Sequence, residues 1–434
     1  MWARFAVATS LLVQRLESMK MHGTTVLEIS EFNRGWKVLV ASSVGVAAGL
    51  SGIVFYTFGV FVAPLMAAFG WTRGQTVIGA STLTIATAIT APIVGSVIDR
   101  YGARRTAITS MLLVVLGYLA LTQINSNILT FYATWFLLAL AGGGTTPVIW
   151  TRSVSIWFDK RRGMALGLCL AGSGLTGILG PLYVTFLIKR FGWEAGYLGV
   201  AAVILFVGAP VIYLMFRERP AAGLDRGTSS VSTLESGSTV HDAVRTAAFW
   251  KLGLAFFVIS GVVAALLVNL VPLLTDRGLT SMEAAGIAGF LGFAVIVGRI
   301  GIGYLVDHIS AAGVAFGVLS AAAVGCVLLS MQGLSWAPFA AVIAFGLAAA
   351  TEVDLLAFMT SRHFGMKAYG KIYGLQVSIF YAGAACGPLA IGVAYDRFNG
   401  YTEILYFCAA AFAFGALLLC TLGKPRELDA ALAS

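Results

Sequence analysis

Four charged side chains stand deep inside long apolar stretches of this sequence: Arg152, Arg299, Glu352 and Asp354. A guanidinium can hold a carboxylate through two parallel, charge-assisted hydrogen bonds. A buried carboxyl group can take up and release a proton as its surroundings change. An arginine with acidic residues nearby is therefore suited to binding a small organic anion together with a proton.

The apolar stretches around these charges predict a membrane protein. Of the 434 residues, 59% are hydrophobic and 11% are charged, and the mean hydropathy is +0.90. A helix of about 20 apolar residues crosses a bilayer core, whereas barrel strands would show short alternating segments. The sequence predicts an all-α protein with twelve membrane helices, at residues 37–66, 75–98, 106–124, 128–157, 163–188, 196–216, 249–274, 284–306, 312–332, 336–361, 370–395 and 402–422.

The charges between these helices predict the orientation of the chain in the membrane. Of the 28 Lys and Arg residues, 21 lie on the side that carries both termini, 5 on the other side and 2 within helices. Basic residues concentrate on the cytoplasmic side of membrane proteins. We therefore expect a multi-pass protein of the cell inner (cytoplasmic) membrane with both termini cytoplasmic, and the net charge of +9 needs no nucleic-acid partner.

The sequence gives no pattern typical of an enzyme. The five cysteines fall in the apolar stretches at no metal-ligand or redox spacing, and the four histidines are scattered. No nucleotide-binding loop or catalytic triad is apparent. We expect no catalytic residue, no metal and no cofactor, and a monomer that binds a small organic anion and protons.

An internal repeat divides the chain into two halves. "APLMAAFGWT" at Ala63–Thr72 aligns with "VPLLTDRGLT" at Val271–Thr280, a shift of 208 residues, and two further pairs agree within one residue. Such parallel repeats form transporters whose substrate site lies between the halves. The predicted units are a cytoplasmic segment 1–35, a six-helix bundle 36–216, a cytoplasmic linker 217–248, a second bundle 249–422 and a cytoplasmic tail 423–434.

The same alignment separates residues that serve the fold from those that serve function. Arg299 aligns with Ala91, Glu352 with Thr145 and Asp354 with Pro147. A charge in the bilayer is costly and is retained where it has a role. Because these charges occur in one half only, we assign them to function.

The stretch "GSVIDRYGARR", Gly95 to Arg105, resembles the loop motif of the major facilitator superfamily, and it lies in the same place, between the second and third helices. In that family the loop holds the two halves together in one state. The resemblance implies a conformational or gating role for Gly95, Asp99, Arg100, Gly102 and Arg104, and for Asp307, which follows the repeated Gly-x-x-x-Asp pattern.

The stretch "WFDKRRGMALGLCLAGSGLTG" from Trp157 is similar to the monocarboxylate transporters. The stretch "FGVFVAPLMAAFGWTRGQ" from Phe58 is similar to those proteins and to the related oxalate and formate exchangers. In the monocarboxylate branch an arginine in the eighth helix receives the substrate carboxylate, and Arg299 matches it. The chain departs from that branch at Val295, where an aspartate takes part in proton coupling, and at Tyr56, where animal members have a lysine.

Depth in the membrane suggests which charges meet. Arg299 lies eight residues before Asp307 and Glu352 ten before Arg362, so their depths differ by about 3 Å. Glu352 and Asp354 point in different directions, and we expect only one of them to share a cavity with Arg299. One alternative is a permanent Arg299–Glu352 ion pair that only ties two helices together.

The remaining candidates are polar groups in helices that line the cavity in this superfamily: Tyr56, Asn269, Gln376 and Tyr381 as substrate contacts. Arg152, near the cytoplasmic end of the fourth helix, is expected to act in gating. The predicted function is proton-coupled uptake of a small monocarboxylate or related organic anion by alternating access, with Glu352 or Asp354 carrying the proton. The alternatives are exchange of organic anions, efflux of amphipathic compounds, and a sensor that binds a ligand without transport.

Overall fold

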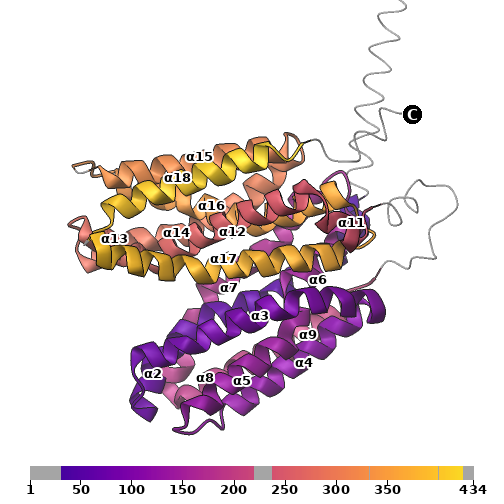
Figure 1. The fold of residues 1–434 in the computed structure, drawn as a ribbon. Helices are drawn as coiled ribbons and strands as arrows, with labels where there is room; N and C mark the ends of the chain where they lie inside the picture. The colour runs from indigo at the N-terminus through magenta and orange to yellow at the C-terminus, as the bar shows by residue number, and fades with distance from the viewer. Residues whose placement is uncertain (1–30, 219–236, 332, 399, 424–434) are drawn as a thin grey trace, which may run out of the picture.

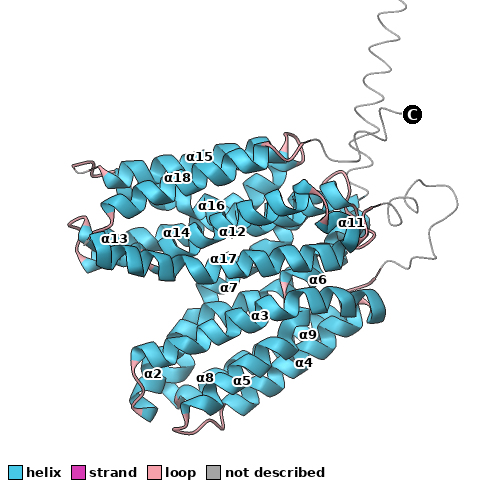
Figure 2. Ribbon diagram, in the orientation of Figure 1, coloured by secondary structure: helices cyan, strands magenta, loops and turns pink. Residues whose placement is uncertain are grey.

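The computed structural model describes residues 31–218, 237–331, 333–398 and 400–423. In this part the chain is helical, apart from turns and one isolated bridge between Gly237 and Gly365 (Figure 2). Most of the predicted segments 1–35, 217–248 and 423–434 lies outside the described residues, at 1–30, 219–236 and 424–434.

Twelve helical stretches of the described chain are long and apolar enough to cross a membrane, which confirms the predicted fold class. They are Glu31–Phe69, Gly74–Ile98, Ala103–Leu121, Ile128–Trp157, Arg162–Phe191, Trp193–Met215, Ala247–Val268, Met282–Val306, Ala311–Ser330, Ala337–Phe364, Tyr369–Tyr395 and Thr402–Cys420.

The first six stretches form the N-terminal bundle. Helical residues 31–48 lead into η1 (Leu50–Val54) and α2 (Phe55–Phe69), and the following elements are α3 (Arg73–Tyr101), α4 (Ala103–Leu121), α5 (Ile128–Ala141), η2 (Gly142–Thr145), α6 (Pro147–Trp157), α7 (Arg162–Phe191), α8 (Trp193–Val203), η3 (Ile204–Gly208) and α9 (Ala209–Met215). The core of this bundle contains stacked and edge-on aromatic rings, among them Phe61, Tyr118, Trp135 and Tyr197.

The last six stretches form the C-terminal bundle, which the short helix α11 (Val240–Val244) precedes. Its elements are α12 (Ala247–Val268), α13 (Leu270–Asp276), α14 (Ser281–Val306), α15 (Ala311–Ser330), α16 (Ala337–Phe364), α17 (Tyr369–Phe398) and α18 (Thr402–Cys420). Glycines allow the closest approach in this bundle, since a Cβ on Gly387 would lie 1.9 Å from the carbonyl oxygen of Gly261.

The two bundles begin their corresponding helices in the same way. Thr72 and Gln75 form a capping box at the start of α3, and Thr280 and Glu283 form one at the start of α14. In each box the threonine side chain accepts from a backbone N–H three residues on, and the other side chain accepts from the threonine N–H. The cap residues Thr72 and Thr280 are related by the repeat of 208 residues.

Two predicted helices are interrupted by residues that cannot complete a helical hydrogen bond. The fourth breaks at η2, because Pro147 has no backbone N–H and starts α6 instead. The seventh ends at Val268. There the Asn269 side chain donates to the carbonyl of Ala265, and Pro272 follows in α13.

The bundles contact each other along the half of the molecule on which the described ends of the linker lie, here called the linker side (Figure 1). Between α3 and α17, Gly95 approaches Gly370 and Ser378 Oγ donates to the carbonyl of Ala88 at 2.6 Å. The helices of the two bundles diverge toward the opposite side (Figure 1).

The second pair of helices between the bundles, α7 and α14, follows the same pattern. A Cβ on Gly163 would lie 2.5 Å from the carbonyl oxygen of Gly303, one on Gly167 would lie 2.2 Å from that of Arg299, and one on Gly174 would meet Ile296 at 2.6 Å. These contacts extend from the linker side to about the middle of both helices. The structure is therefore closed on the linker side.

Candidate substrate site and gate

An ion pair joins α14 to α16 beside the contact between the bundles. Arg299 Nη1 donates to Asp354 Oδ1 at 2.8 Å, and the two side chains are only 9% and 5% exposed. The backbone carbonyl of Arg299 packs against Gly167 of α7, so the arginine lies directly at the N-terminal bundle. A buried pair of this kind is costly to desolvate and is weak support for stability alone.

The partner of Arg299 is Asp354, which differs from the Arg299–Glu352 pair considered from depth alone. Two residues along a helix rotate a side chain by about 200°, so the two acids cannot both face α14. Depth along the membrane says nothing about this rotation. Asp354 is the acid that pairs directly with Arg299, and the expectation that only one acid shares its cavity stays a prediction.

The charged atoms around the pair have unused hydrogen-bonding capacity. Within the described chain, Arg299 Nε, Asp354 Oδ2 and Glu352 Oε2 are buried and have no hydrogen-bond partner. Buried polar groups are normally paired, and a guanidinium offers five N–H donors. Arg299 therefore retains donors for a second carboxylate, and a carboxyl proton on either acid would supply a donor as well.

Two predicted tyrosines lie near the interface. Tyr381 of α17 lies near the side chain of Ser51 in η1 and near Glu352, so it stands between the two bundles close to the acids. Tyr56 of α2 is half-buried, and its ring packs 3.1 Å from where a Cβ on Gly177 of α7 would stand. Both positions are compatible with a site between the bundles.

The other two predicted contacts form hydrogen bonds inside the C-terminal bundle, although Gln376 Oε1 is buried without a hydrogen-bond partner in the described chain. Gln376 is fully buried, and its Nε2 donates to the carbonyl of Phe249 on α12 at 2.9 Å. Asn269 Nδ2 donates to the carbonyl of Ala265, and its Oδ1 accepts from the hydroxyl of Tyr401 at 3.5 Å. These bonds give both residues a packing role, and substrate contact by them stays a prediction.

A pair of tyrosines that the sequence analysis did not select lies between α17 and the N-terminal bundle. Tyr369 and Tyr373 stack with ring centroids 5.3 Å apart, and the Tyr369 hydroxyl is 3.3 Å from Thr151 Oγ1. The Tyr373 hydroxyl is buried and has no hydrogen-bond partner in the described chain. The signal that could have found them is their spacing of four, which places two polar rings on one face of an otherwise apolar helix.

On the linker side, Asp307 connects the two bundles through a helix N-terminus. Its two carboxylate oxygens accept from the backbone N–H groups of Gly163 at 2.7 Å and Met164 at 2.8 Å, at the start of α7. A carboxylate is stabilised there by free N–H groups and by the helix dipole. This contact forms only where the bundles meet, and the gating role of Asp307 stays a prediction.

Further polar contacts close the same side. Arg162 Nη1 donates to Ser361 Oγ at 3.1 Å across the bundles, and Arg362 donates to the carbonyl of Asp159 at 3.1 Å. Arg152 packs at the start of α17, since a Cβ on Gly370 would lie 3.6 Å from its Cδ. This position agrees with a gating role for Arg152, which stays a prediction.

The residues of the loop motif separate into two groups. Gly102 has φ +85°, and Arg104 donates its backbone N–H to Glu218 at 2.5 Å and a guanidinium N–H to the carbonyl of Tyr213, so this part fastens α4 within the N-terminal bundle. Arg100 is exposed and lies over the ring of Tyr101. The side chain of Asp99 lies outside the described part.

We predict that Gly95→Ala weakens closure of the linker side. A Cβ at Gly95 would lie 2.3 Å from the carbonyl oxygen of Gly370, and backbone cannot yield as a flexible side chain can, so α3 and α17 must move apart. The expected result is at least a threefold rise in the fraction of molecules open on the linker side, measured by spin-label distances between the bundles. Gly301→Ala is the matched control, because nothing lies within 4 Å of a Cβ there.

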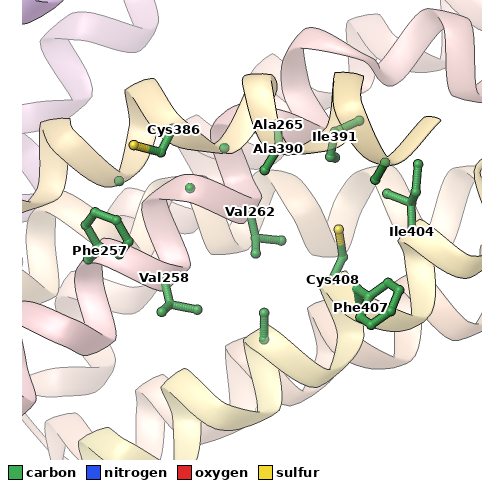
Figure 3. A pocket seen from close by; sticks show the side chains of 15 residues that line it. Phe257, Val258, Val262, Ala265, Cys386, Ala390, Ile391, Ile404, Phe407 and Cys408 are labelled. Atoms are coloured by element: carbon green, nitrogen blue, oxygen red, sulfur yellow. The ribbon is translucent and has the colours of Figure 1, made fainter. Parts of the chain in front are cut away.

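A separate apolar groove lies between α12, α17 and α18, with a volume of about 370 Å³ (Figure 3). Its lining includes Phe257, Val262, Cys386, Phe407 and Cys408 and no charged residue. None of the lining residues comes from α14 or α16. The groove therefore does not include the Arg299–Asp354 pair and is unsuited to hold an anion.

Two bundles of membrane helices, closed on one side around a buried ion pair, define a membrane transport protein. The sequence profile described as Major Facilitator Superfamily matches residues 44–388. The chain belongs to the Major Facilitator Superfamily, whose members are transporters and not enzymes.

Relatives and solved structures agree with this assignment. The chain is 25% identical over 414 residues to monocarboxylate transporter 13 of Bos taurus, covering 91% of this chain and 93% of the relative. It is 26% identical over 407 residues to monocarboxylate transporter 11 of Homo sapiens, covering 91% and 84%. The fold is similar to that of the human organic anion transporter MFSD10, with a TM-score of 0.68, 15% identity and coverage of 88% and 99%. It is also similar to FucP in the outward conformation, with a TM-score of 0.69, 15% identity and coverage of 89% and 98%.

Proposed function

We propose that this protein is a secondary active transporter that takes up a small monocarboxylate or related organic anion together with a proton. The observation that carries the proposal is the buried pair of Arg299 and Asp354 between α14 and α16, with Glu352 two residues away. A charge pair retained in a membrane interior, beside the contact between two bundles, is a functional-site hypothesis by default.

In this mechanism the substrate and Asp354 compete for Arg299. An incoming carboxylate takes the guanidinium through charge-assisted hydrogen bonds, and Asp354, which loses its partner, takes up a proton. The empty site holds one positive and one negative charge. The loaded site has the same net charge, because the proton neutralises Asp354 and the bound anion supplies the negative charge in its place. The bundles can therefore change state with the site neutral both empty and loaded, whereas an anion bound without a proton leaves a buried excess charge.

The named relatives support the substrate class, since two of them are monocarboxylate transporters aligned over most of the chain. Val295 stands where that branch places its coupling aspartate. Asp354 supplies a carboxyl to the same arginine from the neighbouring helix, so we assign it the coupling role and Glu352 a supporting one. Tyr381 and Tyr56 are the proposed contacts from the flanking helices.

The predicted charge asymmetry supports the orientation. The linker side bears most of the Lys and Arg residues, so we assign it to the cytoplasm. We propose that the protein is a monomer in the cell inner membrane. With that orientation, closure on the linker side corresponds to an outward-facing state. We propose the domain boundaries predicted from the sequence, with the linker 217–248 joining the two bundles on the cytoplasmic side.

Exchange of organic anions is the nearest alternative, because the same arginine would serve two anions in turn. The apolar groove between α12, α17 and α18 is the observation that favours an amphipathic compound instead, and with it efflux. Transport of an anion and efflux of an amphipathic compound differ in whether anionic ligands compete for Arg299.

Thermal unfolding of the purified protein tests the proposal. Ligands that bind the folded state raise its apparent stability, by about 2.7 kcal/mol at a hundredfold excess over Kd. We expect a short carboxylate in a panel of carboxylates, aromatic acids and cationic amphiphiles to raise the unfolding temperature by several degrees. Stabilisation by cationic amphiphiles alone would contradict the anion site and support the efflux alternative.

A further inference from the structure

A histidine on the linker side forms a contact between the two bundles. The Nε2 atom of His308, just after α14, is 2.9 Å from Nη1 of Arg161, which precedes α7. The Nδ1 atom of His308 is 2.7 Å from the backbone carbonyl oxygen of Tyr304. Arg161 belongs to the N-terminal bundle and His308 to the C-terminal one, so the contact exists only when this side is closed.

The two partners determine the protonation state of the ring. A carbonyl oxygen only accepts, so Nδ1 of His308 must carry a hydrogen and donate to Tyr304. A guanidinium only donates, so Nε2 must be unprotonated and accept from Arg161. The closed structure therefore contains the neutral imidazole in a single tautomer, and a second proton has no place in it.

The charged groups around His308 are engaged elsewhere. Next to it in the chain, just after α14, the Asp307 carboxylate accepts from Gly163 and Met164 and also attracts Arg161 and Arg362. From the segment before α7, Asp159 pairs with Arg162 at 3.0 Å and with Arg362 of α16 at 3.6 Å. Glu31 faces the backbone N–H groups of Lys160 and Arg161. The Tyr304 ring lies against both the imidazole and the Arg161 guanidinium.

We propose that His308 is a proton-binding site by which acid on the linker side opens the contact between the bundles. Protonation of Nε2 removes the acceptor of Arg161 and places two cations at hydrogen-bonding distance. Their repulsion acts across the bundles and favours the arrangement in which they separate. His308 is exposed to solvent, so the proton reaches it without crossing the protein.

The neighbouring Asp307 responds to acid with the opposite sign. Burial raises the pKa of its carboxyl above the ordinary value, and the hydrogen bonds from Met164 and Gly163 lower it by less. An acid whose pKa is raised in the closed state is protonated more readily there, so closure gains stability as the pH falls through that raised pKa. Opening on acidification is therefore assigned to His308, and the His308→Gln variant separates it from any response of Asp307.

The test measures the distance between the bundles by pulsed electron spin resonance. Spin labels at the exposed positions Arg105 and Lys367 report the linker side in a variant whose five native cysteines are replaced. Between about pH 8 and pH 6, across which histidines commonly change charge, we expect the ratio of open to closed molecules to rise at least about threefold, as suits an exposed charge pair. The rise should shrink in about 1 M salt, which screens exposed charges.

His308→Gln is the decisive variant, because the amide oxygen can still accept from Arg161 and the side chain cannot be charged. We expect it to stay closed at both pH values, and Arg161→Gln to lose most of the pH response. His363→Gln is the matched control: His363 also bonds a carbonyl one turn back, and its Nε2 has no hydrogen-bond partner within the described chain. An unchanged wild-type ratio, or a full pH response in His308→Gln, would overturn the proposal. No substrate is needed, so the outcome is independent of the proposed anion.

Discussion

Arg299→Ala is expected to reduce uptake of the anion at least about a hundredfold and to remove the thermal stabilisation by carboxylates. Each hydrogen bond to a charged group is worth about 1.5–3 kcal/mol, and a bidentate contact contains two. The affected step is binding, because the guanidinium of Arg299 is the group proposed to hold the substrate carboxylate. The measurement is uptake of the best ligand of the thermal panel into proteoliposomes.

Loss of folding has to be separated from loss of the site. Removing one partner of a buried ion pair costs about 3–5 kcal/mol, because the remaining charge is left alone. The double variant Arg299→Ala, Asp354→Asn removes both charges and should recover much of the unfolding temperature without recovering binding. Carboxylate stabilisation that persists in this double variant would show that the anion binds elsewhere.

A matched arginine of the same bundle is available as a control. Arg277 donates to the carbonyl of Ser330 and to Thr402 Oγ1, on the side opposite the linker. Arg277→Ala should lower stability through these bonds and leave the affinity for the anion within about threefold. An equal loss of binding in Arg277→Ala and Arg299→Ala would assign the effect to the stability of the bundle.

The sequence predicted the fold because membrane helices are recorded in composition. Local residue types suffice to predict the fold. They include the lengths of the apolar runs, the repeat at a shift of 208 residues and the aligned Thr72 and Thr280. The interruptions were missed because an apolar run continues through them. Pro147 and Pro272 are present in the sequence, but hydropathy does not register that proline lacks a backbone N–H.

The sequence predicted which residues form the candidate site, but not which of them pair with each other. Arg299 was identifiable since a lone cation in an apolar run needs a partner, but the choice of Asp354 over Glu352 depends on how α16 is rotated against α14. Packing of neighbouring side chains fixes that rotation. For the same reason the sequence could not predict that the Gln376 amide donates to Phe249 on α12, nor the Arg161–His308 contact.

Asp354→Asn is expected to abolish accumulation of the anion driven by a pH gradient while preserving exchange of internal for external anion. Asparagine cannot carry the proton that balances the substrate charge, so the loaded and empty carriers no longer change state with the same net charge. Exchange needs only the loaded carrier, and Arg299, free of a competing carboxylate, still binds the anion. We expect pH-driven accumulation to fall to the level without a gradient and exchange to stay within about threefold of wild type.

Glu352→Gln distinguishes the two acids, because it removes a carboxyl two residues away that does not pair with Arg299 in the described structure. If Asp354 is the coupling group, Glu352→Gln keeps most of the accumulation, and the pH at which anion binding is half-maximal moves in Asp354→Asn and not in Glu352→Gln. The reverse pattern would assign the proton to Glu352 and leave Asp354 as the resting partner of the arginine. Accumulation that survives in both variants and in the double variant would contradict proton coupling, and anion exchange at Arg299 would then be the better description of transport.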